Sequence, residues 1–187
     1  MTMTLPLFAS FEDITMSYDT LHDLLIAELQ DIHSAETQLL AALPLMVKHA
    51  TTTELSEAFT THLADTRQQV DRLVKIFTTL GVTPKGDTCK GMQGVLAEAA
   101  ETLKKKGDPL VIDAAIIGAA QRVEHYEIAA YTSAIALAKS MKHTDVVKHL
   151  EASLAEEQSA SELLTSIGDS KVLAKAPGMP TAGSKSR

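Results

Sequence analysis

The chain of 187 residues has the length of one domain, and its 45% hydrophobic residues are enough for a substantial core. Its formal charge of −7 argues against nucleic acid as a partner, because phosphate binding requires clustered lysine and arginine. The single cysteine, Cys89, allows no internal disulfide. No unbroken apolar run is long enough for a membrane span, and the N-terminus has no signal-peptide pattern. We therefore expect a cytoplasmic protein that binds neither nucleic acid nor membrane.

Two long helices are predicted in the first half of the chain. The first begins near Ser17 and extends helically to about Ala50, after an end or kink at Pro44. Residues 51–54 resemble a capping box that opens the second helix, and Gly81 stands where a left-handed C-cap belongs. The second helix has a heptad core seam, formed by Leu55, Phe59, His62, Thr66, Gln69, Leu73, Ile76 and Leu80.

The second half of the chain repeats this arrangement. Residues 82–107 form a long connection with a short helix over 92–106. Asp108-Pro109, an N-cap followed by proline, predicts a third long helix over 109–140. A fourth, capped by Thr144, extends to residue 167. We therefore predict an all-α, ferritin-like four-helix bundle of two antiparallel helical hairpins joined by a long crossover that contains a short helix.

The composition also predicts the domain boundaries. Residues 1–16 form an N-terminal extension, and residues 17–168 form the bundle. Residues 169–187 are rich in proline, glycine, serine and lysine, which is typical of a disordered tail.

Each of the four long helices carries acidic or polar side chains on its apolar face. Burying a carboxylate is costly unless it is paired, protonated or bound to a metal. A solvated face, an internal salt bridge and a metal site are therefore the competing interpretations. The residues concerned are Glu36 in the first helix, His62 and Asp65 in the second, Glu124 and Glu127 in the third, and Glu157 in the fourth.

The spacing of these residues places them at one height in the bundle. The first interhelical turn lies midway between Glu36 and Thr66, and the second lies midway between Glu127 and Glu157. Antiparallel helices of equal rise bring such pairs to the same depth. Carboxylates gathered there would repel one another unless cations or protons intervened. Carboxylates and an imidazole from facing helices are typical of di-iron or di-manganese sites.

At these residues the chain resembles the YciE/YciF family of ferritin-like stress proteins. The resemblance covers about residues 18–167 and is carried by LHDLLIAELQDIHSAETQLLAALPLM, ELSEAFTTHLADTRQQVDRLVKIF, AAQRVEHYEIAAY and LEASLAEEQSASELL. That family is similar to rubrerythrin-type proteins, which implies a dinuclear centre with two iron or manganese ions per chain. It also implies a homodimer, a role in bacterial stress and a site that can react with O2 or peroxide.

The resemblance implies a metal shell of four glutamates, completed by His62 and Asp65. The glutamates are Glu36, Glu124, Glu127 and Glu157. The second helix departs from the pattern, because it reads His-x-x-Asp where such bundles have Glu-x-x-His. Whether His33 or Gln69 joins the shell stays open. An alternative function is a non-enzymatic helical stress protein that acts by association and keeps a vestigial metal site.

Overall fold

The computed structural model describes residues 18–178, and all regular secondary structure in this range is helical. The predicted all-α class is therefore confirmed. The predicted N-terminal extension, residues 1–16, lies outside the described residues. The elements in chain order are α1 (Leu21–His49), α2 (Thr53–Leu80), α3 (Lys90–Leu103), α4 (Pro109–Ser140), α5 (Thr144–Ile167) and the π-helix η1 (Gly168–Leu173).

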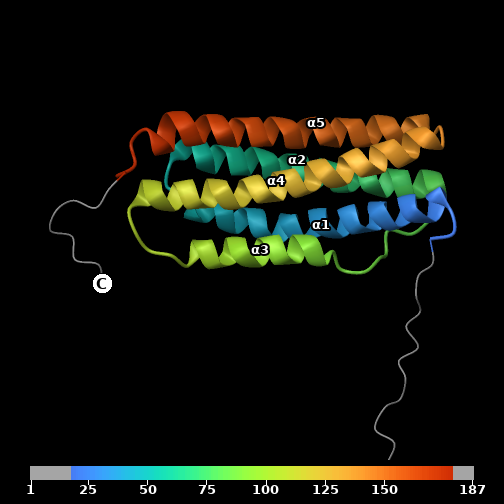
Figure 1. Cartoon of the computed structure of the whole chain (residues 1–187), viewed down its shortest axis with the longest axis horizontal. Coiled ribbons are helices and arrows are strands. Elements are labelled where there is room, and N and C mark those ends of the chain that lie inside the picture. Colours follow the sequence, from blue (N-terminus) through green and yellow to red (C-terminus); the bar gives the residue numbers. More distant parts are fainter. Residues whose placement is uncertain (1–17, 179–187) are drawn as a thin grey trace, which may run out of the picture.

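Four long helices form a bundle in which each helix packs against two neighbours. Helix α1 contacts α2 and α4, and α5 contacts the same two helices. Figure 1 shows α1 and α5 running in one direction and α2 and α4 in the other, so each contacting pair of these four helices is antiparallel. The short helix α3 lies outside the bundle, against α1 and α4. This is the predicted arrangement of two helical hairpins joined by a long crossover.

Helix α1 is less interrupted than its proline suggests. It begins after Thr20, whose side chain forms a capping box with Asp23, slightly later than predicted. The helix continues through Pro44 to its end. Leu43 and Met46, on either side of the proline, are both buried, and this packing offsets the backbone hydrogen bond that proline cannot make.

The start of α2 is held by a residue of α4 rather than by the predicted capping box. Thr52 is the N-cap, but its side chain makes no capping hydrogen bond within the described part of the chain. Instead, the buried carboxylate of Asp113 accepts hydrogen bonds from the backbone N–H groups of Thr51 and Thr52, both at 2.8 Å. The Thr51 hydroxyl donates to it at 2.9 Å. Asp113 thereby fixes the height of the first hairpin relative to the second.

The other helix ends follow the local sequence closely. Gly81 has a φ of 71° and forms the predicted left-handed C-cap of α2. Asp108 caps α4 with Pro109 in its first turn, as predicted. The N-cap of α5 is His143, so Thr144 lies one residue inside the helix that it was expected to cap.

The folded domain continues past residue 168, where the predicted disordered tail was placed. Val172 in η1 is completely buried and belongs to the same core cluster as Ile117 and Leu164. The side chain of Lys171 also reaches Glu54 of α2, with its Nζ 3.0 Å from Oε1. Residues 169–173 are therefore part of the bundle, because burial of one apolar side chain anchors the turn that carries it.

The core consists of two apolar clusters with a polar layer between them. One cluster includes Leu39 of α1 and Phe59 of α2, and the other includes Ile32 and Leu73 of the same two helices. The polar layer therefore occupies the middle of the bundle, at the depth predicted from the spacing. Among the described residues, no helix is long and apolar enough to cross a membrane.

Candidate metal centre

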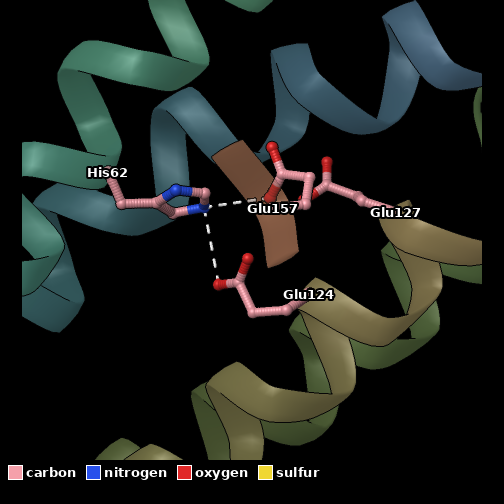
Figure 2. A group of neighbouring side chains, drawn as sticks. All are labelled: His62, Glu124, Glu127 and Glu157. Atoms are coloured by element: carbon pink, nitrogen blue, oxygen red, sulfur yellow. Dashed lines mark ion pairs between the residues drawn. The ribbon is translucent and has the colours of Figure 1, made fainter. Parts of the chain in front are cut away.

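Four side chains from three helices converge in the polar layer. His62 comes from α2, Glu124 and Glu127 from α4, and Glu157 from α5 (Figure 2). Each offers one donor atom, and these atoms all lie within 4.8 Å of one another. All four residues are buried, with His62 the most exposed at 4%. Donor atoms at this spacing form a group that could hold a metal ion.

The imidazole of His62 faces two carboxylates at ion-pair distance without a hydrogen bond to either. Its Nε2 lies 3.5 Å from Glu124 Oε1 and 3.8 Å from Glu157 Oε2 (Figure 2), and both distances exceed the usual hydrogen-bond range. Neither ring nitrogen has a hydrogen-bond partner in the described part of the chain. Buried side-chain polar atoms in folded proteins almost always have one. The buried ring nitrogens of His62 are therefore available to bind a metal ion beside these carboxylates.

The carboxylates of this layer are also short of partners. Both oxygens of Glu127 and one oxygen each of Glu36, Glu124 and Glu157 are buried without a hydrogen-bond partner among residues 18–178. Leaving one such group unsatisfied costs about 1–3 kcal/mol, and more if it is charged. An oxygen-rich donor set with one imidazole suits iron or manganese better than structural zinc, which prefers thiolate and imidazole. The residues present therefore fit the predicted metal ions.

Glu36 lies in the same layer but outside the group of four. It is completely buried on α1, and the hydroxyl of Tyr131 donates a hydrogen bond to its Oε1. Burial, and then the negative charge of Glu157, raise the pKa of Glu36 well above its ordinary value. The hydroxyl of Tyr131 thus orients this carboxylate. The ligand role of Glu36 stays a prediction, and its position adjoins the group.

Asp65, the shortest of the predicted acidic ligands, lies apart from the group of four. It is half-buried and lines an open groove between α2 and α5 together with His62 and Glu156. Burial is the main cause that raises its pKa. In α2 the fully inward positions after His62 belong to Thr66 and Gln69, as the heptad seam predicted. The structure thus places Asp65 at the rim of the centre, and its role as a ligand remains a prediction.

A hydrogen-bonded cluster lies directly beside Glu157. The amide nitrogen of Gln69 donates to Glu157 Oε1 and, at 3.1 Å, to Glu156 Oε2. Arg72 donates to the Glu156 carboxylate at 2.7 Å and to the hydroxyl of Ser153 at 2.9 Å. Gln69 therefore orients Glu157, and Arg72 balances the charge of Glu156. Sequence reasoning placed Gln69 on the inner face but missed the pair of Arg72 and Glu156, because both are ordinary surface residue types.

His33, the remaining candidate for the shell, points to other contacts. Its ring packs edge-on against Phe77, with centroids 5.8 Å apart and an interplanar angle of 83°. It is not among the four side chains whose donor atoms converge.

The protonation states in the layer follow from burial. Burial, and then neighbouring carboxylates, raise the pKa values of Glu124 and Glu127 well above the ordinary range. Burial likewise raises the pKa of Glu157 to about 7 and lowers that of His62 to about 4. In the absence of a cation these pKa shifts favour protonated carboxyl groups and a neutral imidazole. A bound cation therefore has to compete with protons for this layer.

We predict that the metal-free protein loses stability as the pH rises above 6.5, the ordinary pKa of histidine. A carboxyl group with a raised folded-state pKa contributes stability that is lost as the pH rises through that pKa; for Glu157 the window runs from 4.5 to about 7. For Glu124 and Glu127 it extends higher. His62 acts in the opposite direction, but only between about 4 and 6.5. Urea unfolding of chelator-treated protein checks this, and a midpoint that increases above pH 6.5 would contradict it.

The comparisons with known proteins agree with this architecture. A family model described as "Domain of unknown function (DUF892)" matches residues 20–177. The protein YciF of Escherichia coli K12 is 35% identical over 162 residues, which covers 86% of this chain and 98% of YciF. The family model and YciF each match most of the chain, so the resemblance spans the whole bundle.

Three solved structures have the same fold. The crystal structure of YciF, described as an E. coli stress protein, superposes with a TM-score of 0.78 at 35% identity and covers 80% of this chain and 95% of that one. YcfI from Rhodopseudomonas palustris gives 0.78 at 42% identity, with 83% and 98% covered. A Xanthomonas campestris protein at 20% identity and 0.66, with 83% and 95% covered, supports the fold alone. The chain therefore belongs to the DUF892 family, and the resemblance to YciF predicted from its sequence is confirmed.

Proposed function

We propose that this protein binds two iron or manganese ions in the buried polar layer, as a dinuclear carboxylate protein of the bacterial stress response. The proposed ligands are Glu36, His62, Glu124, Glu127 and Glu157. The observation that carries the proposal is the set of buried donor atoms without partners among the described residues, which includes both oxygens of Glu127 and both nitrogens of His62. Such a set costs a folded protein several kcal/mol unless a cation compensates it.

The side chains of the layer have separable tasks in this proposal. Four carboxylates balance the charge of two divalent ions, and the neutral imidazole of His62 offers a nitrogen lone pair. Gln69 and Tyr131 hold Glu157 and Glu36 in fixed orientations by the hydrogen bonds described above. The two apolar clusters on either side keep bulk water out. The bound metal would supply redox chemistry toward O2 or peroxide. A homodimer, as expected from the resemblance, is part of the same proposal.

A second candidate is a non-enzymatic structural role. It is favoured by the description of YcfI, which suggests a structural protein, and by the His-x-x-Asp order in α2. In this alternative the carboxyl groups of the layer stay protonated and the centre binds no metal. The two candidates differ in one measurable property, the number of ions bound per chain.

Glu157→Ala is expected to lose at least one of about two bound ions per chain, because Glu157 adjoins both His62 and the α4 glutamates. The measurement is an anaerobic Mn(II) titration of chelator-treated protein, followed by the free Mn(II) signal in electron paramagnetic resonance. Glu162→Ala is the matched control, since Glu162 lies exposed on the same helix. If Glu157→Ala binds as many ions as the wild type, Glu157 is not a ligand.

A further inference from the structure

An open groove leads from the surface between α2 and α5 to the central layer. It has a volume of about 420 Å³. Four alanines line it, Ala58 from α2 and Ala152, Ala155 and Ala160 from α5, and the buried His62 lies at its inner side. Small side chains at these positions leave room that larger ones would fill, so the groove extends inward as far as the edge of the buried imidazole.

A second, much smaller space lies behind the groove. It has a volume of about 10 Å³, close to that of one water-sized probe. Ala58, His62, Ala160 and Leu163 line both spaces, and Glu124 lines the inner one. A few side chains, with His62 among them, therefore separate the outer groove from a carboxylate of the centre.

His62 and two carboxylates make the groove suitable for a cation, which its alanines alone would not. The residue is buried at 4% exposure and lines the groove, and neither ring nitrogen has a hydrogen-bond partner within residues 18–178. Two acidic side chains, Asp65 and Glu156, line the outer part. Arg72 forms an ion pair with Glu156 and therefore neutralises the charge of Glu156 more than that of Asp65. A cleft lined by carboxylates concentrates cations and increases their rate of association.

The face opposite the groove is covered by another helix. Helix α3 covers the side formed by α1 and α4, opposite the groove (Figure 1). Two other surface hollows lie near the start of α1, and none of the four central side chains lines them. Of these hollows in the described part of the chain, the groove between α2 and α5 is the one that a proposed ligand, His62, lines.

We propose that divalent cations reach the central layer through this groove, with Asp65 as the outer carboxylate that receives them and His62 as the group at its inner end. The inference rests on the proposed metal function. In this proposal Asp65 binds the ion only on its way in and is not a ligand of the final metal centre. The proposal also explains why the walls at Ala155 and Ala160 are small, since a bulky side chain there would obstruct the path.

The test is the rate of Co(II) uptake, followed by stopped-flow absorbance, together with the final number of ions bound. Ala155→Trp is expected to slow uptake about tenfold or more and to leave the final number unchanged. Ala41→Trp is the control, because Ala41 is exposed on α1 away from the groove. Asp65→Asn is expected to slow uptake about threefold at low salt, with the difference disappearing at high salt. Asp71→Asn, exposed on the same helix, should have no effect.

The outcomes separate this inference from the function on which it rests. Wild-type uptake rates in both Ala155→Trp and Asp65→Asn, with normal final binding, would overturn the access route alone. A changed oligomeric state of Ala155→Trp with unchanged uptake would also overturn it, in favour of an interface between copies of the chain. If Ala155→Trp does not fold, Ala155→Leu and Asp65→Asn decide the question. Failure of the wild-type protein to bind Co(II), Fe(II) or Mn(II) would overturn the proposed function itself.

Discussion

Adding Mn(II) anaerobically to the chelator-treated protein is expected to raise its melting temperature by about 5–10 °C or more, once free metal exceeds the dissociation constant about 100-fold. A ligand that binds only the folded state at that concentration adds about 2.7 kcal/mol per site. Each kcal/mol shifts the melting temperature of a chain of this size by about 2–4 °C. The polar layer is the reason for the expected size of the effect, because a cation would relieve several unpartnered buried oxygens at once.

The control for this shift is the same addition to Glu157→Ala, which should move the melting temperature much less. Mg(II) at equal concentration is a second control for general ionic effects. Equal, small shifts in the wild type and the variant would contradict the metal proposal. They would favour the structural alternative, in which the layer is held together by protonated carboxyl groups.

Glu127→Leu is expected to stabilise the metal-free protein by about 1–4 kcal/mol while abolishing stabilisation by metal. Glu127 is buried at 1% exposure, and both its oxygens are unpartnered among the described residues. Burial, and then the charge of Glu36, raise its pKa, so ionising it in the folded protein is costly. Leucine has a similar volume and removes that cost. The measurement is urea unfolding near pH 7.5, with and without Mn(II).

Glu162→Leu is the matched control for this variant, because a surface substitution is expected to change stability by only about 0.5 kcal/mol. A metal-free Glu127→Leu protein that is clearly less stable than the wild type would show that Glu127 stabilises the fold itself. A variant that keeps the full metal-induced shift would remove Glu127 from the ligand set. The expected combination, higher stability with lost binding, is typical of a residue kept for function at a cost in stability.

The helices could be predicted because their signals are local and periodic. The heptad seam of α2 correctly placed His62 and Gln69 on the inner face. Gly81 and the Asp108-Pro109 pair marked helix ends that the structure shows. Equal spacing from the two turns predicted a common depth for Glu127 and Glu157, and the structure brings these carboxylates together with His62.

Contacts between distant segments could not be predicted in the same way. Asp113 caps α2 from a position 62 residues away from Thr51, and nothing in its local sequence marks it as a cap. Asp65 follows His62 by less than one helical turn, and whether it faces inward depends on the packing of α5 rather than on spacing alone. Because the aspartate side chain is short, a small rotation of the helix is enough to take its carboxylate out of reach of the centre.

Cys89, for which the sequence excluded only an internal disulfide, also has contacts that could not be predicted. Its Sγ lies 2.9 Å from the Tyr126 hydroxyl and 3.1 Å from Asp31 Oδ2, and burial raises the pKa of the thiol. These contacts attach the start of α3 to α1 and α4. A lone cysteine in a loop-like segment gives no indication of such partners, because they come from helices that the crossover meets only in the folded chain.

The most direct test of the central claim is the metal content per chain of untagged protein purified without chelator, measured by elemental mass spectrometry. The dinuclear proposal predicts about two iron or manganese atoms per chain, with Glu124 and Glu127 among the groups that hold them. Less than about a tenth of an atom, not increased by anaerobic addition of Fe(II) or Mn(II), would contradict the proposal. The buried carboxylates of the bundle would then have a structural role.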